Sequence, residues 1–160
     1  MDKNNDKNTL AAFAVCMAIP LALGGIVFLL IKDSVWIYEF LNKPRFAPDR
    51  KLFGPVWTAL YALMGISSYM VWISTEDRMQ SDALKVYALQ LGVNLLWPII
   101  FFNFRMYTLA FIEIIVLLAL VIWMVVLFAG VNKKSAYLQI PYVLWSAFAC
   151  VLNGAIVLLN

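Results

Sequence analysis

The stretch MYTLAFIEIIVLLALVIWMVVLFAGV, residues 106–131, decides the fold class of this chain. Glu113 is its only charged residue. At about 1.5 Å per helical residue, a run of this length can cross the roughly 30 Å of hydrocarbon in a bilayer. Lipid offers no hydrogen-bond partners, so an apolar segment of this length must satisfy its backbone internally, as a helix does. The run therefore predicts a transmembrane helix.

Four further apolar runs share this character. They span residues 10–31, 53–73, 86–104 and 136–159, and none of them contains a charged residue. A retained first helix is favoured over a cleaved signal peptide, because no small-residue cleavage pattern follows that run. We therefore predict an all-α integral membrane protein: a five-transmembrane-helix bundle that forms a single multi-pass membrane domain over residues 1–160.

The composition excludes several other classes of protein. Hydrophobic residues make up 64% of the chain and the net charge is only +3, so no basic face is available for nucleic acid. The chain has no histidine and only two cysteines, Cys16 and Cys150, which leaves no ligand set for a metal. We expect no metal, no cofactor and no nucleic-acid partner. Basic residues divide six against six between the two sides of the bundle, so the orientation stays open.

The connection between the first two runs, residues 32–52, is unusually long. Helix connections in bundles usually have about 2–8 residues, and longer ones are often functional. This one contains Trp36 and Tyr38 with Pro44 and Pro48, which favours an ordered segment over a solvated linker. We predict a long ordered lid loop over the mouth of the bundle. The alternative is that its aromatic residues simply lie among the lipid headgroups.

Three of the runs carry a polar or aromatic stripe at helical spacing. An amide that faces acyl chains has no partner, so Gln90 and Asn94 are expected to point into the bundle. Stripes that converge there would line an apolar cavity suited to a flat, conjugated ligand. Interhelical hydrogen bonding and simple aromatic packing are the competing interpretations. The stripes contain Trp57, Tyr61, Met64, Ser68 and Trp72, then Gln90, Asn94, Trp97 and Phe101, and finally Trp145, Ala149 and Leu152.

Two smaller features suggest hypotheses. Ala88 and Gly92 form a small-xxx-small pair, which allows close backbone approach and predicts a homodimer interface. Glu113 is an intramembrane carboxylate, and such a residue is by default a functional hypothesis. It could couple proton movement to transport, hydrogen-bond a ligand or make only an interhelical contact.

With these residues described, the chain resembles the TspO/MBR family, the tryptophan-rich sensory proteins and translocator proteins formerly called peripheral-type benzodiazepine receptors. The resemblance covers most of the chain. The matching residues are Tyr38, Leu41, Lys43, Pro44, Pro48, Phe53, Pro55, Val56, Trp57, Leu60, Tyr61, Met64, Gly65, Gln90, Leu91, Asn94, Trp97, Phe101, Phe102, Pro141, Tyr142, Trp145, Phe148, Ala149, Leu152 and Asn153.

The resemblance implies a five-helix bundle, usually dimeric, with a cavity under the first loop. That cavity would bind porphyrins and ligands of the isoquinoline carboxamide and benzodiazepine types. Carried over residue by residue, its ligand-binding residues would be Tyr38, Pro48, Trp57, Tyr61, Asn94, Trp97, Phe101, Trp145, Ala149 and Leu152. The implied partners are a porphyrin or a related flat hydrophobic molecule, membrane lipid and a second copy of the chain, in a bacterial cell membrane.

The resemblance also raises the question of an enzymatic activity. Some bacterial members are proposed to promote light- and oxygen-dependent breakdown of porphyrin, and the tryptophans implicated there match Trp57 and Trp145. Such a reaction would need no conventional catalytic acid, base or metal site. These two residues are therefore the candidate catalytic residues.

Two departures from the family pattern affect what can be carried over. The second proline of the family's lid is Asp49 here, so ligand selectivity can differ. The cholesterol motif of animal members needs a tyrosine and a basic residue after the asparagine that matches Asn153, and neither is present. Cholesterol recognition is therefore not expected.

The predicted function is a membrane tetrapyrrole-binding protein that senses, transports or degrades porphyrin. One alternative is a small proton-coupled multidrug or metabolite transporter that uses Glu113. Another is a structural membrane assembly factor.

Overall fold

A computed structural model describes residues 3–74 and 78–160, with side chains from residue 9 onward. Within these residues the chain is helical and contains no β-strand. The helices are α1 (Lys3–Ile31), α2 (Phe53–Trp72), α3 (Arg78–Pro98), α4 (Tyr107–Val131), α5 (Lys133–Leu138) and α6 (Ile140–Leu159). Two short 3-10 helices, η1 (Val35–Phe40) and η2 (Arg50–Leu52), lie between α1 and α2. A π-helical turn, η3 (Ile99–Asn103), continues α3.

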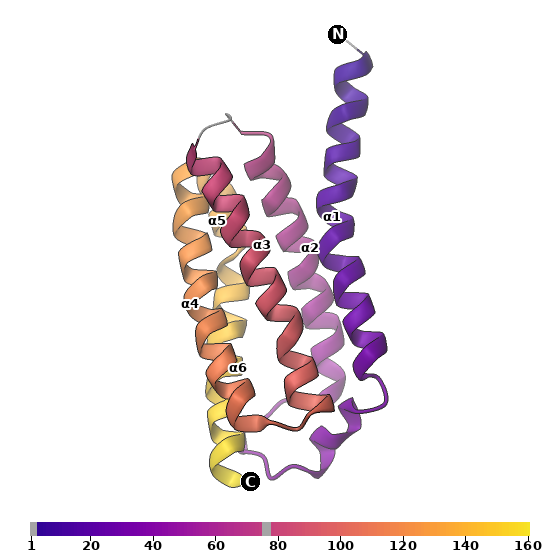
Figure 1. Ribbon diagram of the computed structural model, residues 1–160, viewed down its shortest axis with the longest axis vertical. Helices are drawn as coiled ribbons and strands as arrows, with labels where there is room; N and C mark the ends of the chain where they lie inside the picture. The colour runs from indigo at the N-terminus through magenta and orange to yellow at the C-terminus, as the bar shows by residue number, and fades with distance from the viewer. Residues whose placement is uncertain (1–2, 75–77) are drawn as a thin grey trace.

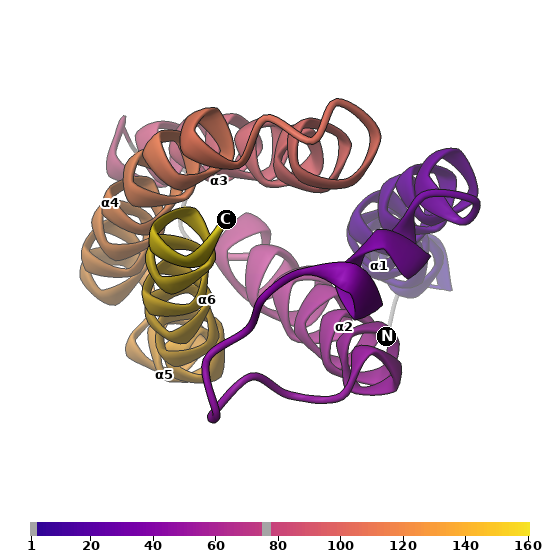
Figure 2. The same cartoon turned by 90° about the horizontal axis from the view of Figure 1, so that it is seen from below.

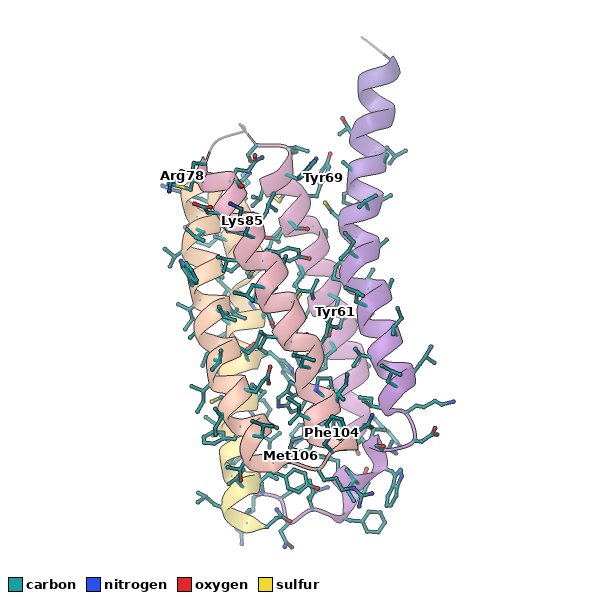
Figure 3. The ribbon with its side chains drawn as sticks, viewed as in Figure 1. Tyr61, Tyr69, Arg78, Lys85, Phe104 and Met106 are labelled. Atoms are coloured by element: carbon teal, nitrogen blue, oxygen red, sulfur yellow. The ribbon has the colours of Figure 1, made fainter. Side chains whose placement is uncertain are left out.

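The long helices run side by side along one axis (Figure 1). α1 packs mainly on α2, α3 packs on α4, and α4 packs on α6. Seen along the axis, α1 stands at the edge of the bundle, beside α2 and apart from α4 and α6 (Figure 2). Arg78 and Lys85 lie near one end of the molecule and Phe104 and Met106 near the other, with Tyr61 between them (Figure 3). The peripheral position of α1 matters for the site described below.

Four segments are long and apolar enough to cross a membrane: Thr9–Ile31, Arg78–Asn103, Tyr107–Val131 and Lys133–Leu159. α4 has one buried face and one exposed face, and both are apolar. Leu117 and Val121 are buried, while Ile112 and Val116 are about half exposed on the opposite side. An apolar residue on the outside of a helix is expected where the solvent is lipid. The protein is therefore an integral membrane protein.

α2 is not among these four segments, so the predicted count of five spans is not reproduced. The helix has 20 residues and no charge. Its tryptophan, tyrosine, serine and glycine residues keep its mean hydropathy below that of the apolar stretches in the four segments. These residue types are tolerated because much of α2 lies inside the bundle, where Tyr61, Ser67 and Ser68 are buried.

Several helix ends differ from the prediction. α1 begins at Lys3 rather than at residue 10, and α3 begins at Arg78 rather than at residue 86. A run of apolar residues marks only the part of a helix that can lie in hydrocarbon. The helix itself can continue with polar residues beyond the end of that run. Lys85 and Asp82, for example, form an ion pair of 3.1 Å within the first turns of α3. Of the predicted connection before α3, residues 75–77 lie outside the described residues.

The predicted last helix, residues 136–159, is divided in two in the structure. α5 ends at Leu138 and α6 begins at Ile140, with Gln139 between them. Pro141 lies in the first turn of α6, where its missing N–H interrupts no helical hydrogen bond. A proline in this position favours a new helix start over a continuous helix.

The connection over residues 32–52 is ordered by its own contacts and by contacts to the end of α6. The Tyr38 hydroxyl donates to the Pro48 carbonyl at 3.2 Å. The Asn42 amide N–H donates to Oδ1 of Asn160 at 3.0 Å, and the Asn160 side chain donates back to the Asn42 carbonyl. Figure 2 shows the segment running from α1 past the end of α2 toward α6 and then back to the start of α2. Burial raises the pKa of Tyr38 to about 12, and Glu39 and Asp49 contribute to this rise.

α1 and α2 approach each other closely at Gly65. A Cβ atom at this position would meet the Met17 Cα at 2.8 Å and the Cys16 carbonyl oxygen at 3.0 Å. Both are backbone atoms, which cannot move aside as a flexible side chain could. Gly25 differs, because a Cβ there would meet nothing within 4 Å.

We expect Gly65→Ala to lower the free energy of unfolding by about 1–3 kcal/mol, because the methyl group would push α1 away from α2. Thermal unfolding in detergent measures the effect. Gly25→Ala is the matched control and should be neutral or stabilising by up to about 1 kcal/mol, since alanine favours the helix. Equal midpoints for the two variants would show that the α1–α2 contact is not as close as described.

Candidate ligand-binding site

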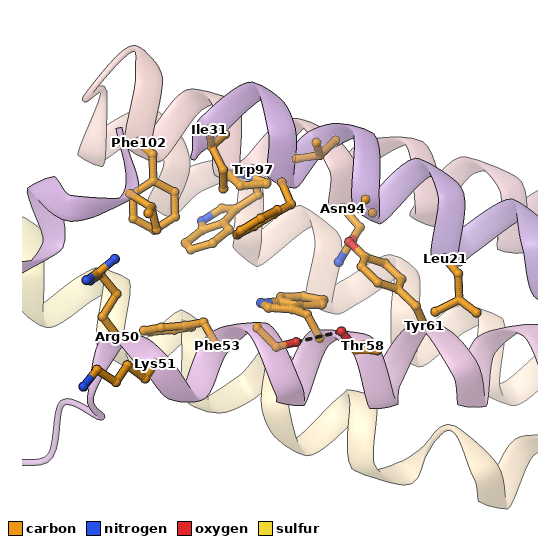
Figure 4. Close-up of a pocket in the computed structure, with 18 residues that line it drawn as sticks. Leu21, Ile31, Arg50, Lys51, Phe53, Thr58, Tyr61, Asn94, Trp97 and Phe102 are labelled. Carbon is orange, nitrogen blue, oxygen red and sulfur yellow. Dashed lines mark hydrogen bonds between the residues drawn. The ribbon is translucent and has the colours of Figure 1, made fainter. Parts of the chain in front are cut away.

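A pocket of about 440 Å³ lies between α1, α2 and α3, next to the 32–52 connection. Figure 4 shows it from the side, with Trp97 and Phe102 facing Phe53 and Thr58 across the space. Its lining is mostly aromatic and aliphatic. The lining residues are Leu21, Gly24, Gly25, Val27, Phe28, Ile31, Val35, Arg50, Lys51, Phe53, Gly54, Trp57, Thr58, Tyr61, Asn94, Trp97, Pro98 and Phe102.

The aromatic rings of the walls pack on one another and on Phe101, which lies behind Trp97. Trp97 lies 5.2 Å from Phe101 and 5.9 Å from Phe102, measured between ring centroids. On the opposite wall Trp57 lies 5.7 Å from Tyr61. Offset and edge-to-face pairs at these separations are favourable, so the rings are fixed in position before any ligand enters. The pocket is therefore a preformed slot between aromatic surfaces.

A buried chain of hydrogen bonds closes the inner end of the pocket. The Tyr61 hydroxyl donates to Oδ1 of Asn94 at 2.8 Å, and Nδ2 of Asn94 donates to the Tyr142 hydroxyl at 3.0 Å. Tyr142 in turn donates to Oε1 of Gln90 at 2.8 Å. The chain joins α2, α3 and α6. Gln90 and Asn94 are 0% and 2% exposed, which confirms that both amides point into the bundle.

The outer end of the pocket carries charge. Arg50 and Lys51 line it next to Phe53, at the point where η2 leads into α2. Nε of Arg50 donates to Oε1 of Glu39 at 3.1 Å. The pocket thus runs from basic groups at its mouth to a neutral hydrogen-bond chain at its base.

Four of the ten predicted ligand-binding residues line this pocket: Trp57, Tyr61, Asn94 and Trp97. The other six lie behind its walls or elsewhere. The rings of Tyr38 and Trp145 lie 5.3 Å and 6.0 Å from the ring of Phe53, on which both pack from outside the pocket.

Phe101 packs in the same way behind Trp97. Pro48 accepts the hydrogen bond from Tyr38, and Ala149 and Leu152 are buried in α6. The pocket and the predicted residue set therefore overlap in part.

Sequence reasoning missed the contribution of α1, which supplies a whole wall. From Leu10 onward this helix is mainly aliphatic and shows no polar or aromatic stripe. The available signal was the Gly24–Gly25 pair within a run of bulky residues. A Cβ at Gly24 would overlap the Tyr61 ring, and Gly25 leaves open space. Adjacent glycines can thus mark a helix face that makes room for a neighbour or a ligand.

The residues predicted for a dimer interface lie at a second depression. Ala88 and Gly92 are exposed on α3 and line an apolar groove of about 610 Å³ between α1, α2 and α3. Trp72 and Cys16 contribute to the same groove. This groove shares no lining residue with the first pocket.

Glu113 lines neither depression. Both of its carboxylate oxygens are buried, and neither has a hydrogen-bond partner in the part of the chain that the structure describes. The described residues also contain no group of three or more histidine, cysteine, aspartate or glutamate side chains that could hold a metal ion.

We expect Tyr142→Phe to lower the free energy of unfolding by about 1–3 kcal/mol, because it removes two buried hydrogen bonds and leaves the Gln90 amide without a partner. Thermal unfolding in one detergent provides the comparison. Tyr69→Phe is the control, since the Tyr69 ring packs on Phe13 and phenylalanine would preserve that contact. A similar small change in both variants would mean that the hydrogen-bond chain adds nothing to stability.

Comparison with known proteins identifies relatives of this chain. The model of the TspO/MBR family matches residues 13–159. Tryptophan-rich protein TspO of Archaeoglobus fulgidus is 37% identical over 158 residues, which cover 96% of this chain and 99% of that protein. Tryptophan-rich protein TspO of Chlorobaculum tepidum is 33% identical over 153 residues, or 92% of this chain and 94% of that protein.

The alignment with an animal relative covers less of both chains. The human translocator protein is 34% identical over 118 residues, which cover 72% of this chain and 70% of that protein. The family match spans nearly the whole chain, and the microbial relatives align over almost their full length. The chain therefore belongs to the TspO/MBR family.

Proposed function

We propose that this protein binds a porphyrin, or a closely related flat tetrapyrrole, in the pocket between α1, α2 and α3. The observation that carries the proposal is the pair of aromatic walls, with Trp97 and Phe102 facing Phe53 across an open slot. A planar conjugated ring can stack on such walls. The volume of about 440 Å³ also lies within the usual range of small-molecule pockets.

The same pocket suits ligands of the isoquinoline carboxamide and benzodiazepine types. These are compact aromatic molecules with an amide carbonyl. Nε1 of Trp97 is a buried donor with no partner among the described residues, and Trp97 lines the pocket. A ligand carbonyl could accept from this N–H, which would otherwise remain unsatisfied.

The membrane arrangement that we propose has five spans in a single domain. α2 would be the fifth span, with one face buried in the bundle, and α5 with α6 would cross as one segment. The 32–52 connection would serve as a lid, since it crosses the end of the bundle next to the pocket mouth. The bacterial cell membrane is the proposed location.

A homodimer is proposed to form through the groove that contains Ala88 and Gly92. Small residues on α3 allow a second helix to approach closely there, and the groove is apolar along its length. The dimer would leave the ligand pocket accessible, because the two depressions share no residues.

Light-dependent breakdown of the porphyrin is a further part of the hypothesis. Trp57 lines the pocket and would contact the ligand, whereas Trp145 packs behind Phe53. If both tryptophans take part, Trp57 contacts the porphyrin directly, whereas Trp145 is separated from it by the ring of Phe53. Illumination of the complex would distinguish this from sensing or transport, in which the porphyrin spectrum stays unchanged.

We expect Gly25→Leu to weaken protoporphyrin binding by about tenfold or more, because the new side chain would enter the pocket without displacing a neighbour. Titration of the detergent-purified protein in the dark, followed by tryptophan quenching, measures the affinity. Gly92→Leu is the matched control, since its Cβ also meets nothing within 4 Å but faces the other groove. Unchanged affinity in Gly25→Leu would exclude this pocket as the porphyrin site. If the unmodified protein binds no tetrapyrrole, the assembly-factor alternative gains support.

A proton-coupled transporter is the second candidate function, favoured by the buried carboxylate of Glu113. Glu113→Gln separates the two functions. Porphyrin affinity should be unchanged, because Glu113 does not line the pocket, whereas proton-coupled export would be lost. Paired binding and proteoliposome transport assays give the answer. Loss of porphyrin binding together with transport would contradict the assignment of separate roles.

A further inference from the structure

Arg50 lies at the mouth of the pocket, and its ion pair with Glu39 engages only part of its guanidinium group. Oε1 of Glu39 accepts from Nε of Arg50 at 3.1 Å, and Oε2 of Glu39 lies 3.5 Å from Nζ of Lys43. Both carboxylate oxygens of Glu39 are therefore engaged. Arginine carries further N–H donors on its two terminal nitrogens, and none of the described hydrogen bonds uses those of Arg50.

This geometry orients the guanidinium and leaves its outer edge open. In Figure 4 the Arg50 head group lies at the mouth beside Phe102, while the Lys51 ammonium points away from the cavity. The Arg50 side chain is 36% exposed, so it is anchored but reachable. A guanidinium presented in this way matches the two oxygens of a carboxylate.

The charges around the mouth favour an anion. Residues 32–52 contain five basic residues and three acids, and the two charged residues that line the pocket, Arg50 and Lys51, are both basic. Asp49 is itself engaged, since it accepts the backbone N–H of Lys51 at 2.8 Å. The local field is therefore positive next to an aromatic slot.

We propose that Arg50 is the residue that recognises a carboxylate of the ligand: its terminal nitrogens would bind the carboxylate while the aromatic ring system lies between the walls. The proposal rests on the proposed function and specifies the chemistry of its ligand. Glu39 acts as a positioning residue, because it holds the guanidinium through Nε. A small inorganic anion would leave the aromatic walls empty, and a fatty acid would place a flexible chain where rings can stack.

The test compares protoporphyrin IX with its dimethyl ester, which keeps the ring system but carries no carboxylate. Both are titrated against the unmodified protein, Arg50→Gln and Arg45→Gln in a non-ionic detergent. Arg45 is the matched control, because it is an exposed arginine of the same connection that does not line the pocket. Oleate is included as a competitor that carries a carboxylate but no ring.

We expect Arg50→Gln to weaken binding of the free acid by about tenfold and to leave the ester unchanged. Added salt should weaken the acid more than the ester, since the contact lies at a solvent-exposed mouth. Arg45→Gln should change neither affinity, and oleate should compete poorly.

Three results would overturn the inference. Equal weakening of acid and ester in Arg50→Gln would assign Arg50 a structural role. Equal weakening of the acid in Arg45→Gln would indicate general electrostatics, and strong competition by oleate would indicate a fatty-acid site. If the unmodified protein binds the ester but not the acid, only the carboxylate proposal fails, whereas failure to bind either porphyrin overturns the proposed function as well.

Discussion

The need to satisfy polar groups inside a bilayer is the constraint on which the rest of this structure depends. Lipid cannot accept or donate hydrogen bonds, so the amides of α3 must find partners on other helices. Asn94 does so with Tyr61 of α2 and Tyr142 of α6. Gln90 does so through Oε1, which accepts from Tyr142, while its Nε2 has no partner among the described residues. This chain fixes the positions of three helices at one level. It also places the hydroxyl of Tyr61 and the amide of Asn94 at the base of the pocket.

The pocket exists because α1 meets the bundle closely at one place and leaves room at another. Gly65 brings the backbones of α1 and α2 together, and Gly24 accepts the ring of Tyr61. Toward the mouth, Gly25 leaves space, and aromatic residues of α2 and α3 face each other across it. The 32–52 connection then carries Arg50 to the outer end, where Glu39 orients it. The pocket thus has close helix packing at its base, facing aromatic rings along its length and a basic residue at its mouth.

The sequence was most informative where one physical requirement dominated. Long apolar runs located the membrane helices, and the cost of an unpaired amide placed Gln90 and Asn94 inside. It was less informative about which interior space each stripe faces. Periodicity shows that Ala149 and Leu152 face inward, but not that they pack away from the pocket. The Glu39–Arg50 pair and the break at Gln139 depend on loop geometry and helix starts, which hydropathy does not encode.

The measurement that tests the account most directly is NMR of the indole N–H groups during a porphyrin titration. The chain has six tryptophans, and they sample different parts of the molecule. Trp57 and Trp97 line the pocket, whereas Trp123 is exposed on the outside of α4. The account predicts saturable shifts of the Trp57 and Trp97 resonances and no shift of Trp123. Saturable shifts confined to other tryptophans, with Trp57 and Trp97 unchanged, would contradict it.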